Sequence, residues 1–162
     1  MDFRFSVQIK IQKPVHEVFE AVYDPKKLSG YFTSGGSDGP LDEGKEVLWS
    51  FRDGEAEAAV VPVIVLIVVK DHRIRLRWAA SEGVYDAKTG ALPQPGGYDT
   101  TVEMTFESLG EGESLMKITE GDWRQTQKGL EGSYQNCVGW TQMACSLKAY
   151  LEYGINLRKG SF

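Results

Sequence analysis

The sequence has few cysteines and histidines. Only two of each occur among the 162 residues, and neither His16 nor His72 has a second metal ligand at a suitable spacing. Cys137 and Cys145 fall in one predicted helix about 12 Å apart, whereas a disulfide needs α-carbons within about 7 Å. We therefore expect no metal ion, no cofactor and no disulfide.

The chain also lacks an excess of positive charge and a long hydrophobic segment. Eighteen Lys and Arg against 23 Asp and Glu give a formal net charge of -5, which would repel a phosphate backbone. The longest apolar run, residues 58–69, contains Pro62 and is shorter than the roughly 20 residues of a membrane-spanning helix. We expect neither a nucleic acid nor a membrane as a partner.

Length and composition are those of one folded domain. A chain of 162 residues with 41% hydrophobic and 25% charged residues can bury one core, so we expect a single domain over residues 1–162. The first residues already alternate as a strand, with no charged-then-apolar leader before them. This pattern favours a cytoplasmic location.

The N-terminal half predicts one strand, two short helices and three more strands. Apolar residues occupy every odd position from Phe3 to Ile11, which is typical of a strand with one wet face. Pro14 and Pro25 each suit the first turn of a helix. The predicted elements are residues 2–12, 14–24, 25–31, 46–51, 55–69 and 73–80, with a loop at 33–40 and a hairpin turn at Asp53 and Gly54. The apolar run in 55–69 predicts that both faces of the middle of this strand are covered.

The C-terminal half predicts two strands and one long helix. Residues 81–97 are rich in Gly and Pro and are interpreted as a loop, either a functional flap or a tolerated insertion. Strands are predicted at 98–106 and 114–121. An apolar stripe at helical spacing, from Leu130 to Ile155, predicts an amphipathic helix.

These elements predict an α+β fold that can enclose a hollow. An antiparallel sheet with an apolar inner face must be covered, and the terminal helix is the only predicted element long enough to cover it. We expect a curved antiparallel sheet of six or seven strands, in the order β-α-α-β-β-β-β-β-α, wrapped around that helix. The aromatic residues assigned to inward positions either line a hollow or fill it: Trp49, Phe51, Trp78, Tyr98, Phe106 and Trp140.

Glu120 is the one candidate catalytic residue. If Met116 and Ile118 face inward, strict alternation aims Glu120 inward as well. A buried carboxylate has a raised pKa and suits general acid or base chemistry, or a hydrogen bond that orients a ligand. The alternative is that Gly121 bulges the strand and turns Glu120 to solvent.

The order of several motifs carries a family resemblance. The segments concerned are 11–32 with Asp24-Pro25 and Gly30-Tyr31-Phe32, 41–51, 100–107 with 115–123, Gly139-Trp140, and 147–154. Together they resemble the START-like helix-grip superfamily, also called SRPBCC or Bet v 1-type. They are most similar to the family named for homology to the activator of the heat-shock protein 90 ATPase. Two features depart from that family: Tyr31 stands where it usually has Trp, and 81–97 is longer than its usual connection.

The resemblance implies a cavity between sheet and helix that binds a lipid-like or aromatic small molecule. Our first hypothesis is a non-catalytic binding protein for such a hydrophobic molecule. Its candidate ligand-binding residues are Tyr31, Trp49, Trp78, Tyr85, Glu120, Trp140, Met143 and Leu147. The alternatives are a cyclase or hydratase that uses Glu120 or a tyrosine, and an interaction module such as a chaperone partner. The sequence leaves open whether the chain forms a homodimer.

Overall fold

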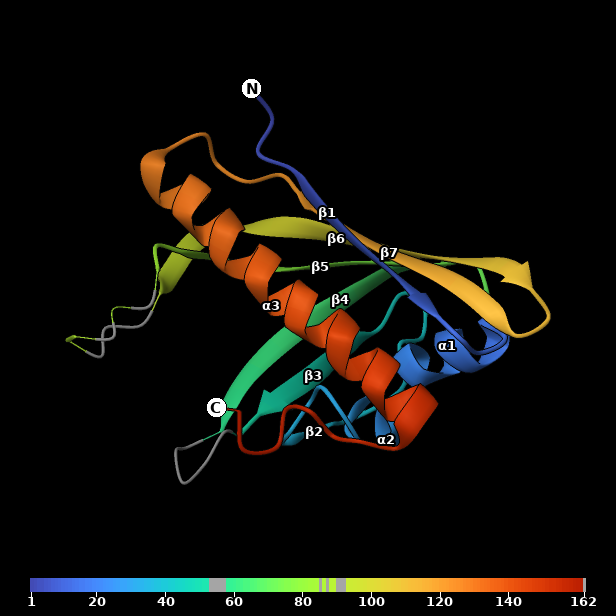
Figure 1. The fold of residues 1–162 in the computed structure, drawn as a ribbon. Helices are drawn as coiled ribbons and strands as arrows, with labels where there is room; N and C mark the ends of the chain where they lie inside the picture. Colours follow the sequence, from blue (N-terminus) through green and yellow to red (C-terminus); the bar gives the residue numbers. More distant parts are fainter. Residues whose placement is uncertain (53–57, 85, 87, 90–92, 162) are drawn as a thin grey trace.

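The chain forms a seven-stranded antiparallel sheet that curves around a long C-terminal helix (Figure 1). The computed structural model describes residues 1–52, 58–84, 86, 88–89 and 93–161. Strands follow one another in the order β1-β7-β6-β5-β4-β3-β2. The elements are β1 (Phe5–Ile11), α1 (Val15–Tyr23), α2 (Pro25–Leu28), β2 (Gly36–Ser37), β3 (Glu46–Phe51), β4 (Ala59–Val69), β5 (Arg73–Glu82), β6 (Gln94–Gly110), β7 (Glu113–Gly121) and α3 (Gln127–Tyr153). This is the predicted helix-grip arrangement.

Local sequence sets where the helices begin and end. The Asp24 carboxylate accepts hydrogen bonds from the backbone N–H groups of Lys26 and Lys27 and so caps α2. The Thr126 hydroxyl caps α3 in the same way, by accepting from the N–H of Gly129. At the other end, Gly154 has a φ of 68°, the left-handed conformation that closes a helix.

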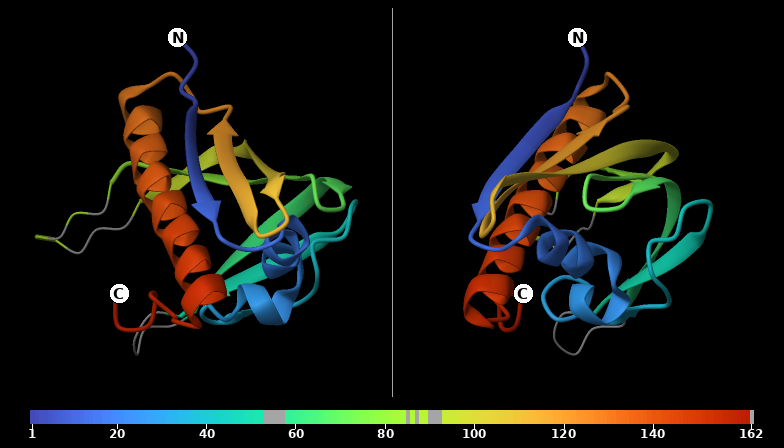
Figure 2. Two further views of the ribbon diagram at one scale, coloured as in Figure 1. Left: turned by 45° about the vertical axis from the view of Figure 1, so that its right-hand side comes forward. Right: turned by 90° about the vertical axis from the view of Figure 1, so that its right-hand side faces the viewer.

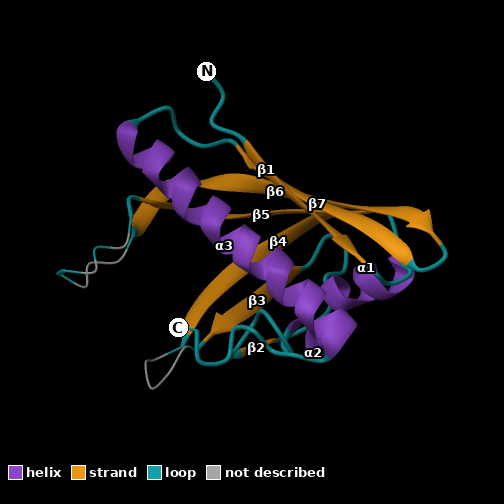
Figure 3. Cartoon of the chain, viewed as in Figure 1, coloured by secondary structure: helices purple, strands orange, loops and turns teal. Residues whose placement is uncertain are grey.

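All three helices lie on the concave side of the sheet (Figures 2 and 3). Helix α3 packs against β1 and β5. Its first turns approach β5 so closely that an added Cβ at Gly132 would collide with the carbonyl oxygen of Ser81. The backbone N–H of Gly83, just beyond β5, donates to the carbonyl of Lys128. The N-terminal half of α3 is therefore fixed directly on the end of β5.

Alternation along the strands builds the core. On β6 the inner positions Thr100, Val102, Met104 and Phe106 are buried, as predicted. Pairing shifts along β4 between Val65 and Ile67, and such irregularities bend a sheet. A second shift, between Ala79 and Ser81, lies beside the hollow described below. One of the irregularities that bend the sheet therefore lies at the wall of the hollow.

The middle of β4 is buried on one face and partly covered on the other. Val63 and Val65 are buried and Ile64 and Leu66 are partly buried, whereas Val60, at the start of the strand, keeps 56% of its surface exposed. The apolar excess of this strand has another reason, since Val60, Val61 and Pro62 line the hollow. The predicted hairpin turn at Asp53 and Gly54 lies outside the described residues.

Element boundaries also differ from the predictions. The loop predicted at 81–97 is shorter, because Ser81 pairs with Pro95 and Glu82 with Gln94. The terminal helix ends before Ile155, which is half exposed rather than part of the buried stripe. The short second helix ends at Leu28, three residues earlier than predicted.

Candidate functional site

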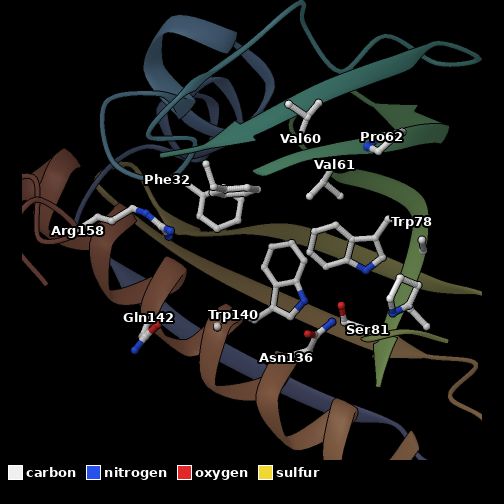
Figure 4. Close-up of a pocket in the computed structure, with 15 residues that line it drawn as sticks. Phe32, Val60, Val61, Pro62, Trp78, Ser81, Asn136, Trp140, Gln142 and Arg158 are labelled. Carbon is white, nitrogen blue, oxygen red and sulfur yellow. The ribbon is translucent and has the colours of Figure 1, made fainter. Parts of the chain in front are cut away.

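A hollow of about 440 Å³ lies between strands β4 and β5, helix α3 and the segment that follows it (Figure 4). Its lining is mainly aromatic and aliphatic. Among the residues that line it are Phe32, Phe51, Val60, Trp78, Asn136 and Trp140. Two further polar side chains, Gln142 and Arg158, line it as well. Size and composition are those of a small-molecule site.

The aromatic rings of this wall contact one another. Trp140 stacks on Phe32 with ring centroids 5.8 Å apart and an interplanar angle of 28°. The indoles of Trp140 and Trp78 lie 5.2 Å apart at 31°. Phe32 also meets Phe51 edge-on at 5.2 Å. Such ring pairs add directional packing energy to the burial of their surfaces, so the wall is stiff.

Glu120 lies behind this wall and is completely buried. It faces inward, as alternation predicts, because β7 keeps regular pairing with β1 and β6 through this position. The alternative of a bulge that turns it to solvent is wrong. Its carboxylate accepts hydrogen bonds from four side chains: Trp78 Nε1 at 2.9 Å, Trp140 Nε1 at 2.7 Å, Thr100 Oγ1 at 2.6 Å and Asn136 Nδ2 at 3.2 Å from each oxygen.

The electrostatics of Glu120 reflect two opposed effects. Burial raises the pKa of Glu120, and the hydrogen bonds from its four partners oppose that rise. Within the described residues no Lys, Arg or His forms an ion pair with it. Neutral donors therefore stabilise this carboxylate, and three of them, Trp78, Asn136 and Trp140, also line the hollow.

The predicted ligand-binding residues separate into three groups. Trp78 and Trp140 line the hollow, and Glu120 lies directly behind them. Four others are buried in the core and are not part of the lining: Tyr31, Trp49, Met143 and Leu147. Tyr85 lies outside the described residues.

Tyr31, a predicted ligand-binding residue, belongs to the core. Its hydroxyl donates to the carbonyl of Ala21 at 3.0 Å, and its ring packs 5.3 Å from that of Tyr150. Burial raises the pKa of Tyr31 well above its usual value. The side chain therefore connects the α1–α2 region to the last turn of α3.

The predicted ligand-binding residues include only two of the lining residues, Trp78 and Trp140, and omit polar ones such as Asn136, Gln142 and Arg158. Asn136 had a usable signal, because it precedes Trp140 by four residues and so shares its face of the helix. Gln142 and Arg158 had none. Arg158 lies beyond the last helix and reaches the hollow only because the chain turns back, which places its guanidinium 5.2 Å from the Phe51 ring centroid.

Among the residues that the structure describes, no group of three or more His, Cys, Asp or Glu could hold a metal ion. Within that same part of the chain, no helix is long and apolar enough to cross a membrane.

Comparisons with known proteins agree on the fold. The family model described as "Activator of Hsp90 ATPase homolog 1-like protein" matches residues 12–152. No curated protein matches this chain. The solved structure of SSP2350 from Staphylococcus saprophyticus has a TM-score of 0.72 at 23% identity and covers 97% of both chains.

Two further solved structures are similar. DynU16, a protein of the dynemicin biosynthetic locus, has a TM-score of 0.72 at 23% identity; the match covers 95% of this chain and 49% of that one. The Aha1 dimer from Colwellia psychrerythraea has a TM-score of 0.66 at 17% identity, with 93% and 97% covered. At these identities the likeness shows a shared fold.

Proposed function

We propose that this chain, which belongs to the Activator of Hsp90 ATPase homolog 1-like family, binds a flat apolar small molecule in the hollow between β4, β5 and α3. The observation that carries the proposal is the aromatic wall of Trp78, Trp140 and Phe32 beside a volume of about 440 Å³. A two- or three-ring molecule fits this volume and stacks on these rings.

Burial of apolar surface supplies the affinity. Each 100 Å² of apolar surface removed from water contributes about 2.5 kcal/mol. The wall needs little ordering on binding, because hydrogen bonds to Glu120 already hold Trp78 and Trp140. A preformed wall lowers the entropic cost that a ligand must offset.

Native mass spectrometry of the freshly purified protein is the first test. A retained molecule would identify the chemical class of the ligand directly. The same spectrum gives the mass of the assembly, and so tests whether a second copy of this chain is a partner, as in the Colwellia dimer.

A titration with N-phenyl-1-naphthylamine, an uncharged fluorescent probe, is the second test. Gly139 lines the hollow, and an added Cβ there meets nothing within 4 Å, so Gly139→Leu places a side chain in the space. We expect this variant to weaken probe binding at least tenfold. Cys145→Leu, at an exposed position of the same helix outside the lining, is the matched control and should bind like the parent. No saturable binding to the parent, or equal binding to both variants, would refute the proposal.

A further inference from the structure

Asn136 presents its amide to the hollow in a fixed orientation. Its Nδ2 lies 3.2 Å from each oxygen of Glu120. An ionised carboxylate only accepts hydrogen bonds, so it selects the NH2 side of the amide and turns Oδ1 away. Nothing in the described part of the chain donates to Oδ1, although Asn136 belongs to the lining.

The other partners of Glu120 fix this arrangement. Indole N–H groups can only donate, so Trp78 and Trp140 both require an acceptor. The Thr100 hydroxyl supplies a third donor at 2.6 Å. Of these partners only the Thr100 hydroxyl could accept a hydrogen bond from a protonated Glu120, because the indole N–H groups and the Asn136 NH2 group can only donate. The ionised form therefore satisfies every partner, and the orientation of the Asn136 amide follows from it.

The two ends of the hollow are lined by different polar groups. Figure 4 shows Asn136 and Ser81 at one end and Arg158 at the other, with Phe32 and Trp140 between them. The Arg158 end is lined by a guanidinium group. At the Asn136 end, the buried carboxylate of Glu120 lies behind the Oδ1 of Asn136, which is unpaired in the described part of the chain. No ion pair within the described residues involves Glu120.

We propose, as an inference that rests on the proposed function, that the hollow selects apolar ligands carrying a hydrogen-bond donor, above all a protonated amine, which binds at Asn136. An ammonium group donates to Oδ1, is attracted by the Glu120 carboxylate and lies against indole faces that favour cations. A carboxylate ligand at Asn136 would meet an acceptor and a like charge.

Isothermal titration calorimetry at pH 7 with four matched naphthalenes tests this selectivity. The probes are 2-naphthylmethylamine, 2-naphthalenemethanol, its methyl ether and 2-naphthoic acid. We expect the amine to bind most tightly, at least tenfold more tightly than the methyl ether, with the alcohol between them and the acid weakest. Equal affinities, or an acid that binds best, would overturn the inference and leave the proposed function standing. If none of the four binds and the uncharged probe also fails, the proposed function itself is wrong.

Variants locate the selectivity. Asn136→Leu removes the acceptor, and we expect the ratio of amine to ether affinity to fall to near one. Gln135→Leu makes the same kind of change one position earlier, outside the lining, and should keep the parent ratio. Glu120→Gln, used if circular dichroism shows that it folds, should reduce the ratio severalfold. If Asn136→Leu keeps the parent ratio of amine to ether affinity, the amine does not bind at Asn136, and this holds whatever the result for Glu120→Gln.

Discussion

Replacing Trp140 with Phe isolates the hydrogen bond between the aromatic wall and Glu120. The Trp140 side chain is 2% exposed, and its Nε1 donates to the carboxylate at 2.7 Å. Trp49→Phe is the matched control. That indole is also completely buried, but its Nε1 has no hydrogen-bond partner among the described residues. The two substitutions remove the same atoms and differ in the bond that is lost.

The magnitudes follow from that difference. Loss of a hydrogen bond to a charged group costs about 2 kcal/mol, and the smaller ring costs about 1–2 kcal/mol in packing in either variant. In Trp49→Phe the packing loss is offset, because an unpaired buried N–H, itself worth about 1–3 kcal/mol of instability, disappears. We therefore expect Trp140→Phe to lower the free energy of unfolding by about 3–5 kcal/mol more than Trp49→Phe does.

Urea denaturation followed by far-ultraviolet circular dichroism measures both values, since each variant removes a tryptophan and so alters the fluorescence. Losses that agree within about 0.5 kcal/mol would refute the reasoning that the Glu120 hydrogen bonds stabilise the fold.

The pH dependence of the same two variants gives a second check. Loss of the Trp140 donor raises the pKa of Glu120 further, because that hydrogen bond favours the ionised form. The folded variant then binds its proton at a higher pH than the folded parent does. Its stability deficit is largest at pH 7 and shrinks as the pH falls through the raised pKa. The deficit of Trp49→Phe should stay constant over this range.

Two further predictions concern the frame around the hollow. Gly132→Ala should lower the free energy of unfolding by about 2 kcal/mol, because its Cβ would collide with the Ser81 carbonyl. Gly139→Ala in the same helix should raise it by about 0.5–1 kcal/mol, since that site is open; thermal denaturation that gives both the same sign would contradict this reading. Tyr31→Phe should cost about 1 kcal/mol and leave binding of the uncharged probe unchanged, because the hydroxyl only donates to a helix carbonyl. Weakened probe binding in this variant would show that Tyr31 contributes to the hollow.

Periodicity in the sequence predicted the fold and the face of the sheet to which each side chain points. It did not predict whether an inward side chain is buried in the core or lines the hollow. Alternation placed Trp49, Trp78 and Glu120 on the inner face of their strands, and the structure agrees. Yet Trp49 is buried in the core while Trp78 lines the hollow. The difference depends on where α3 crosses the sheet, which is a property of the packed molecule rather than of either strand.

Contacts from irregular segments were the least predictable part of the site. Arg158 follows the last helix, in a stretch with no period that could assign it a face. Asn136 is different, because its spacing from Trp140 was visible in the sequence. A polar residue on the apolar face of a covering helix indicates a buried polar partner, and Glu120 was the candidate already identified on the opposing strand.

The geometry of Glu120 also bears on catalysis. A general acid or base must reach the proton that it transfers, directly or through one water molecule. Both oxygens of Glu120 are buried and occupied by donors, and its partners Trp78 and Trp140 stand between it and the hollow. A substrate in the hollow would meet the amide of Asn136 before it met the carboxylate. Glu120 is therefore better suited to position the groups that line the hollow than to exchange a proton with a molecule in it.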